Sequence, residues 1–134
     1  MKKPWEYGAL RVSENKRYLK NGDRPFFWLA DTAWLLCQVC TEEQARMYLR
    51  NRRDKGFTAI QSVLIHRLRG VQASSLAEKE RDATKPEYWA FVDRVVEIAE
   101  EMGLYLALLP AWGDIVKYGM LNEDNVEEYV KFLD

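Results

Sequence analysis

The stretch PFFWLADTAW, residues 25–34, decides how the rest of the chain is interpreted. Its first five residues form an apolar, aromatic run preceded by turn-forming residues, which suits a strand buried on both faces of a parallel sheet. The run ends on Asp31, and Thr32 and Trp34 follow. A carboxylate and a large ring directly after a buried strand are typical of a site at the carboxyl edge of parallel strands. In the alternative interpretation, Asp31 only caps the following turn or helix and Trp34 packs in the core.

The length and composition of the chain limit the number of domains and the kinds of ligand it can bind. The 134 residues are enough for one domain with a genuine core and exclude two large domains. The 20 Lys and Arg against 21 Asp and Glu leave a formal net charge of -1. This balance favours neither nucleic acid nor a membrane as a partner and suits an uncharged or weakly charged ligand. The five Trp and seven Tyr supply faces for packing or for stacking on such a ligand.

Targeting and cofactor signals are weak. No apolar run approaches the roughly 20 residues of a membrane-spanning helix, and residues 1–5 lack the apolar segment of a secretory signal, so a cytoplasmic location is expected. Cys37 and Cys40 form a C-x-x-C motif, but His66 is the only histidine, so too few ligands remain for a zinc site. We predict two reduced, partly buried thiols and no metal or cofactor.

The remaining elements follow from turns, caps and apolar periodicity. Residues 9–24 are predicted to form an antiparallel hairpin that closes one end of the fold. Capping-box spacing at Thr41 and at Thr84 opens two helices, which glycines close at Gly56 and Gly103. The helices cover residues 41–56, 84–103 and 122–133, and the buried strands cover residues 26–31, 57–65 and 104–110.

Alternation of these strands and helices indicates successive βα units with a parallel sheet. An open doubly wound sheet would carry a glycine-rich phosphate loop after the first strand, but residues 30–34 contain no glycine. A (β/α)8 barrel suits polar and aromatic strand ends, although only about three of its eight units are present. The predicted fold is therefore α/β, with residues 25–134 forming the N-terminal portion of a (β/α)8 TIM barrel behind the hairpin in a single partial domain, residues 1–134.

Two strand ends carry the same residue types, because Trp112 and Asp114 follow the third strand as Asp31 and Trp34 end the first. The carboxyl ends of parallel strands share one edge, so we expect Asp31 and Asp114 to lie at that edge, opposite the hairpin. The charged connection of residues 66–83 is predicted to be a mobile loop over this edge.

The chain resembles the N-terminal part of the apiosidase-like glycoside hydrolases, a (β/α)8 family first described as a domain of unknown function. The most specific matches are the D-T-A-W segment of residues 31–34 and the L-P-x-W-G-D segment that ends at Asp114. Further matches lie in residues 10–19, 25–30, 55–61, 88–93, 103–106 and 121–123. The match covers nearly the whole chain, and residues 66–70 depart from it by being more basic.

The resemblance implies an enzyme that degrades plant-type, pectin-like oligosaccharides. Such enzymes break a glycosidic bond with two carboxylates. The resemblance places that pair at the fourth and seventh strands, beyond Asp134, so no catalytic residue is named here. The positions that match the sugar-binding strand ends are Asp31, Trp34, Gln61, Trp112 and Asp114, with His66 as a further candidate.

Two other classes of function remain open. One is a non-catalytic carbohydrate-binding module or a half-barrel that self-associates, since three strands cut from a barrel leave two unpaired edges. The other is a thiol oxidoreductase that uses Cys37 and Cys40, which would require a lowered thiol pKa. As a hydrolase, the chain alone is expected to be inactive.

Overall fold

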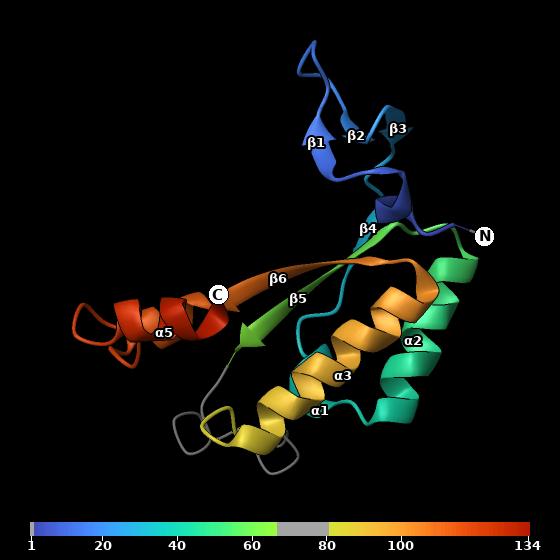
Figure 1. Ribbon diagram of the computed structural model, residues 1–134. Helices are drawn as coiled ribbons and strands as arrows, with labels where there is room; N and C mark the ends of the chain where they lie inside the picture. The colour runs from blue at the N-terminus through green and yellow to red at the C-terminus, as the bar shows by residue number, and fades with distance from the viewer. Residues whose placement is uncertain (1, 67–80) are drawn as a thin grey trace.

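The computed structural model describes residues 2–66 and 81–134 of the chain. A small antiparallel sheet precedes a parallel sheet, and helices pack against one face of the parallel sheet (Figure 1). Within the two described ranges, no helix has the length and apolar character needed to cross a membrane.

The antiparallel sheet contains β1 (Leu10–Val12), β2 (Leu19–Asn21) and β3 (Arg24–Phe26), in that order. The predicted hairpin is therefore confirmed, and it gains a third strand. Gly22 makes the turn between β2 and β3 with a φ of 57°, and a Cβ there would lie 2.0 Å from the carbonyl oxygen of Tyr7. Only glycine fits this turn.

The aromatic run divides between two sheets, which corrects the strand predicted over residues 26–31. Phe26 ends β3, and the first parallel strand, β4 (Ala30–Thr32), begins only at Ala30. Between them Phe27 is 75% exposed and Trp28 40%, so this part of the run is not buried. Antiparallel pairing with β2 takes up residues 24–26, and an apolar pattern alone does not tell which sheet a strand joins.

The parallel sheet has the order β4-β5-β6, with β5 (Ala59–Ile65) and β6 (Tyr105–Ala111) close to the predicted strands. Helices occupy both crossovers, and two more follow β6. They are α1 (Leu36–Val39), α2 (Glu42–Asp54), α3 (Pro86–Met102), α4 (Gly113–Lys117) and α5 (Val126–Leu133). The sequence did not predict α4.

Helix ends follow the predictions with one exception. The Thr41 hydroxyl accepts the Gln44 N–H at 3.2 Å, and the Gln44 side chain accepts the Thr41 N–H at 2.9 Å, which confirms this capping box. The box predicted at Thr84 is wrong, because Lys85 is the N-cap of α3 and makes no side-chain cap bond. Thr84 instead donates its N–H and its hydroxyl to the Asp82 carboxylate, at 3.0 Å and 2.7 Å.

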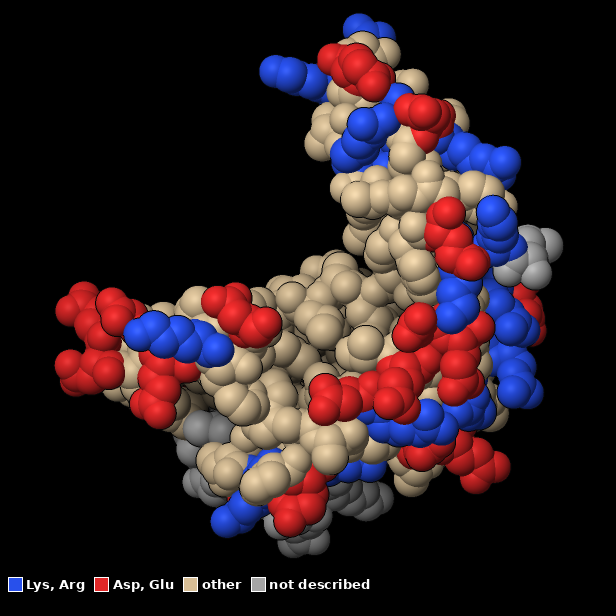
Figure 2. Space-filling view, in the orientation of Figure 1, with Lys and Arg blue, Asp and Glu red and all other residues tan. Residues whose placement is uncertain are grey.

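The core lies between the parallel sheet and helices α1, α2 and α3. It includes the fully or nearly fully buried side chains of Leu49, Ile60, Tyr88, Val95 and Ile98. Side chains alternate along a strand, so the neighbours of Ile60 point away from this core. The sheet therefore has a helix-covered face and an open face. Figure 2 shows a concave, mostly uncharged hollow between the hairpin and α5, while charged side chains gather over α2 and α3.

The hairpin is attached to the amino edge of the parallel sheet. Tyr105, the first residue of β6, packs edge-on against the rings of Trp5 and Phe26, with 5.3 Å between centroids in each pair. The Asn21 amide donates to the Tyr105 hydroxyl at 2.6 Å. The hairpin and Asp114 consequently lie at opposite ends of β6, as predicted (Figure 1).

Ion pairs join the exposed faces of α2 and α3. The Arg94 guanidinium lies 2.8 Å from the Glu42 carboxylate and 2.7 Å from that of Glu97, and Arg46 lies 2.6 Å from Glu101. Hydrogen bonds from Arg94 and Arg46 hold the pKa of Glu42 and Glu101, respectively, below the ordinary glutamate value of 4.5. A single exposed ion pair contributes little to the free energy of unfolding, so the contribution to stability comes from the network as a whole.

We predict that Arg94→Gln lowers the urea midpoint of unfolding at about pH 7 but has little effect at about pH 3. Carboxylates with a lowered pKa in the folded state stabilise above their unfolded pKa and lose this as the pH falls through the folded value. Urea titrations followed by circular dichroism measure the midpoint. Arg53→Gln is the matched control, since Arg53 pairs with the adjacent Asp54. An Arg94→Gln effect that persists in acid would contradict the prediction.

Candidate functional site

Three rings from three segments lie together at the carboxyl edge of the parallel sheet. Trp34 precedes α1, His66 directly follows β5, and Trp112 directly follows β6. The Trp34 and Trp112 ring centroids are 4.9 Å apart. The His66 ring is nearly parallel to that of Trp112, with 11° between planes and 6.2 Å between centroids. We call these three residues the aromatic cluster, which the sequence analysis had named residue by residue without predicting their contacts.

Backbone hydrogen bonds bring the cluster together. The Val63 N–H donates to the Trp34 carbonyl at 3.2 Å, and the Trp112 N–H donates to the Ile65 carbonyl at 2.8 Å. The segments on both sides of β5 are thereby held at its carboxyl end, where their rings meet. Trp112 is 36% exposed, so part of its face is available to a ligand.

Asp114 and Gln61 lie at different distances from the cluster along the sheet. Asp114 is half-buried in the first turn of α4, where the helix dipole favours a carboxylate, two residues after Trp112. Gln61 pairs in register with Thr32 and Ala107 on the open face, nearer the amino edge. The roles of both in ligand binding stay predictions.

Asp31 lies in the middle of β4 and not at a strand end, which corrects its predicted position. Its register partner is Ile60, which in turn pairs with Leu106, so Asp31 is level with the start of β5 and β6. Asp31 and Asp114 consequently do not share one edge of the sheet. The reason is the late start of β4, since residues 24–26 belong to the hairpin sheet and residues 27–29 only connect the two sheets.

The Asp31 carboxylate faces α2. It accepts a hydrogen bond from the Tyr48 hydroxyl at 2.8 Å and lies 2.5 Å from Arg52 Nε, an ion pair whose geometry is not that of an aligned hydrogen bond. The Tyr48 hydrogen bond, with help from the Thr32 N–H and Arg52, holds the pKa of Asp31 below its usual range. These contacts give Asp31 a structural role in joining β4 to α2, and its predicted contact with a ligand stays a prediction.

We predict that Asp31→Asn lowers the melting temperature by a few degrees. The amide keeps an acceptor for the Tyr48 hydroxyl but loses the charge that faces Arg52. Differential scanning calorimetry measures the change, with Asp54→Asn as a control for loss of an exposed carboxylate on α2. If Asp31→Asn melts at the wild-type temperature, the structural role is wrong.

The two cysteines do not have the properties of a redox pair. Both are free thiols; Cys37 is buried and Cys40 half-buried, which confirms the predicted state. Burial raises the pKa of the Cys37 thiol to about 11 and also raises that of Cys40. A thiol oxidoreductase needs the opposite shift. In the described ranges, no group of three or more His, Cys, Asp or Glu side chains is placed to hold a metal ion.

We predict that iodoacetamide alkylates Cys37 about 100-fold more slowly in the folded chain than in urea at neutral pH, because only the thiolate reacts and burial disfavours it. Mass spectrometry of tryptic peptides measures the rate at each cysteine. Rapid modification of Cys37 in the folded chain would restore the oxidoreductase hypothesis.

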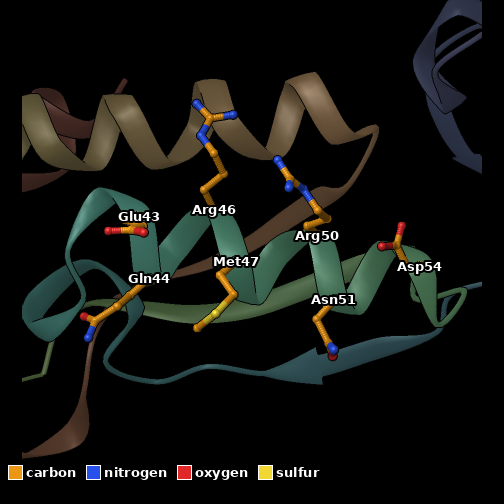
Figure 3. A pocket seen from close by; sticks show the side chains of 7 residues that line it. All are labelled: Glu43, Gln44, Arg46, Met47, Arg50, Asn51 and Asp54. Atoms are coloured by element: carbon orange, nitrogen blue, oxygen red, sulfur yellow. The ribbon is translucent and has the colours of Figure 1, made fainter.

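A separate hollow lies away from the aromatic cluster. It has a volume of about 600 Å³ on the outer side of α2, and side chains of this helix alone line it (Figure 3). These are Glu43, Gln44, Arg46, Met47, Arg50, Asn51 and Asp54. A surface built by one helix offers no convergent groups from other elements, so we do not regard it as the functional site.

The sequence analysis missed three residues that contact candidate site residues: Tyr48 and Arg52 contact Asp31, and Gln38 contacts His66. In the sequence, Tyr48 lies among the apolar residues of α2 and Arg52 among the basic residues near its end, and their spacing of four residues is the signal that they share a face. Gln38 is fully buried, and its only signal was a polar residue within an apolar segment. The predicted mobile loop of residues 66–83 lies outside the described residues except at its ends.

Comparisons with known proteins give one family model and several solved structures. A family model described as "Apiosidase-like, catalytic domain" matches residues 13–134. A solved structure named as a glycoside hydrolase shares 31% sequence identity over 99% of the chain, with a TM-score of 0.81. A glycoside hydrolase family 5 structure from Bacteroides vulgatus ATCC 8482 shares 30% identity over 98% of the chain, with a TM-score of 0.82.

The chain spans only 32% and 31% of the length of these two structures. A third structure, the endo-1,4-beta-mannanase from Rhizomucor miehei, shares 12% identity with a TM-score of 0.65 over 93% of the chain and 40% of its own length. This likeness concerns the fold alone. No curated protein matches the chain.

Proposed function

Since the chain belongs to the apiosidase-like catalytic domain family, we propose that it forms the sugar-binding part of a glycoside hydrolase that acts on plant-type, pectin-like oligosaccharides. The likeness to two glycoside hydrolases, of which the chain spans about a third, supports the hydrolase class. The observation that carries the proposal is the aromatic cluster at the carboxyl edge of the parallel sheet, the edge where barrels of this class place their sites.

The cluster suits a neutral, ring-shaped ligand. The exposed part of the Trp112 ring can stack on the apolar face of a sugar, and the Asp114 carboxylate nearby can accept hydrogen bonds from its hydroxyls. Gln61 supplies an amide on the same open face. The uncharged surface of the hollow between the hairpin and α5 favours such a ligand over an ionic one (Figure 2).

Cleavage needs more than this surface supplies. A glycosidase places an acid and a second carboxylate on opposite sides of the bond that it breaks. Asp31 is engaged with Arg52 on the helix-covered side and level with the start of the strands, which does not suit either role. We therefore propose that later strands of the complete barrel supply both carboxylates and that this chain alone is inactive.

A second candidate function is a non-catalytic sugar-binding module that associates through its open surfaces. In the described sheet, β4 and β6 each have a single neighbour, so one backbone edge of each is unpaired. Large apolar side chains are exposed along the flanks, with Phe27 at 75%, Met47 at 66% and Phe132 at 58%. Such edges and side chains favour pairing with another chain.

We predict that the purified chain does not hydrolyse aryl glycosides or pectin oligosaccharides but binds the latter, and that Trp112→Ala abolishes binding. Removal of the ring takes away its stacking surface. Tryptophan fluorescence titration measures binding, and reducing-sugar release measures hydrolysis.

We also predict that the chain self-associates, so light scattering should give a mass above the 15.8 kDa of one chain. Addition of a polypeptide that carries the remaining strands should restore both a monomeric barrel and activity.

The matched control for the loss of binding in Trp112→Ala is Trp28→Ala. Trp28 is 40% exposed, comparable with Trp112, but it lies beyond the amino edge next to Phe26. Equal loss of binding in both variants would contradict the site. A monomeric chain that hydrolyses a glycoside unaided would contradict the proposal that later strands supply the catalytic carboxylates. Asp114 would then be the first carboxylate to replace.

A further inference from the structure

Gln38, between the two cysteines of the C-x-x-C motif, is a polar side chain with 0% exposure. A buried amide costs free energy unless hydrogen bonds compensate for the lost water. The Gln38 Oε1 accepts the backbone N–H of His66 at 3.0 Å. The buried amide of α1 thus has a specific partner in the chain segment that enters the aromatic cluster.

Main-chain atoms of α1 hold a second segment. The Gln38 carbonyl accepts the Arg81 N–H at 2.8 Å, and the Arg81 guanidinium donates to the Cys37 carbonyl at 3.2 Å. The Arg81 guanidinium also lies over the Phe91 ring of α3, at 3.6 Å from the centroid. Because Arg81 is fixed between α1 and α3, the backbone of Gln38 is itself held in place.

His66 is the first residue after β5, and its backbone N–H finds its partner in a side chain and not in a further strand residue. Its ring stacks on Trp112, which leaves β6. α1 begins directly after Leu35, the residue that follows Trp34. One short helix therefore adjoins Trp34 through the chain and His66 through the Gln38 side chain.

We propose that Gln38 is a positioning residue of the aromatic cluster. Its Oε1 fixes the backbone of His66 at the end of β5, and this sets the His66 ring parallel to Trp112, so that the ring adds to the surface on which a neutral sugar stacks. The contribution to sugar binding rests on the proposed function above. The positioning of the ring does not rest on it.

A single-residue probe tests the positioning, because His66 is the only histidine in the chain. Protein labelled with ¹³C and ¹⁵N in histidine gives one set of ring signals and one backbone amide signal in an NMR spectrum. The Trp112 ring current shifts the His66 ring signals, and Trp112→Leu provides the reference without it. We expect Gln38→Met to move these signals most of the way to that reference, and Gln38→Glu, which keeps an acceptor oxygen at the same reach, to leave them near the wild-type position.

Leu49→Val controls for general destabilisation, since Leu49 is fully buried in the core but belongs to α2. It should lower stability without moving the His66 signals. Signals of Gln38→Met at the wild-type position, or an equal movement in Leu49→Val, would overturn the proposal. If Gln38→Met does not fold, hydrogen exchange of the wild-type His66 backbone amide tests the hydrogen bond to Gln38 instead. An amide bonded to a buried oxygen exchanges slowly, so fast exchange would refute the bond.

Titration with pectin oligosaccharides separates this inference from the proposed function. We expect Gln38→Met to weaken binding as much as His66→Ala does, and the double variant to lose no more than either single one. Additive losses would show that Gln38 does not act through His66. If the wild-type chain does not bind the sugar but Gln38→Met still moves the His66 signals, the sugar site is wrong. The proposal that Gln38 positions the His66 ring then still stands.

Discussion

The antiparallel pairing of β3 with β2 is the constraint on which the rest of the structure depends. By pairing Leu19 with Phe26 and Asn21 with Arg24, it holds residues 24–26 in the hairpin sheet, and the first parallel strand begins only at Ala30. Because side chains alternate along a strand, this starting point also decides their direction. Asp31 consequently faces Tyr48 and Arg52, and Thr32 shares the open face with Gln61.

From that register the two faces of the sheet acquire different chemistry. The helix-covered face contains the apolar core, and the charges of α2 and α3 lie on the solvent side of that layer. The open face stays largely uncharged and leads to the aromatic cluster at its carboxyl edge. A surface of this kind has no strong field to attract ions, so under the proposed function shape and ring stacking would decide what binds there.

Much of this architecture could be predicted from the sequence, because caps, glycines and apolar periodicity are local signals. Thr41 and Gly103 act as predicted, and Trp34 and Trp112, which the sequence analysis named as candidates near strand ends, lie together at the carboxyl edge. What failed depended on contacts distant in sequence. The pattern around Asp31 could not show that β2 takes up the preceding residues, and nothing local indicated that the buried Gln38 meets His66.

Association and ligand binding need not compete, because they use different atoms of the same sheet. Among the residues that the structure describes, β4 and β6 each have one edge without a neighbouring strand, and such an edge presents backbone N–H and carbonyl groups in the plane of the sheet to which another strand can hydrogen-bond. The aromatic cluster lies beyond the ends of the strands, and backbone bonds to β5, the central strand, hold it. Since β5 is already paired on both sides, a strand added at either edge leaves the geometry of Trp34 and Trp112 in place. Under the proposed function, the same separation would let this part of a barrel form the ligand surface while other strands contribute the carboxylates.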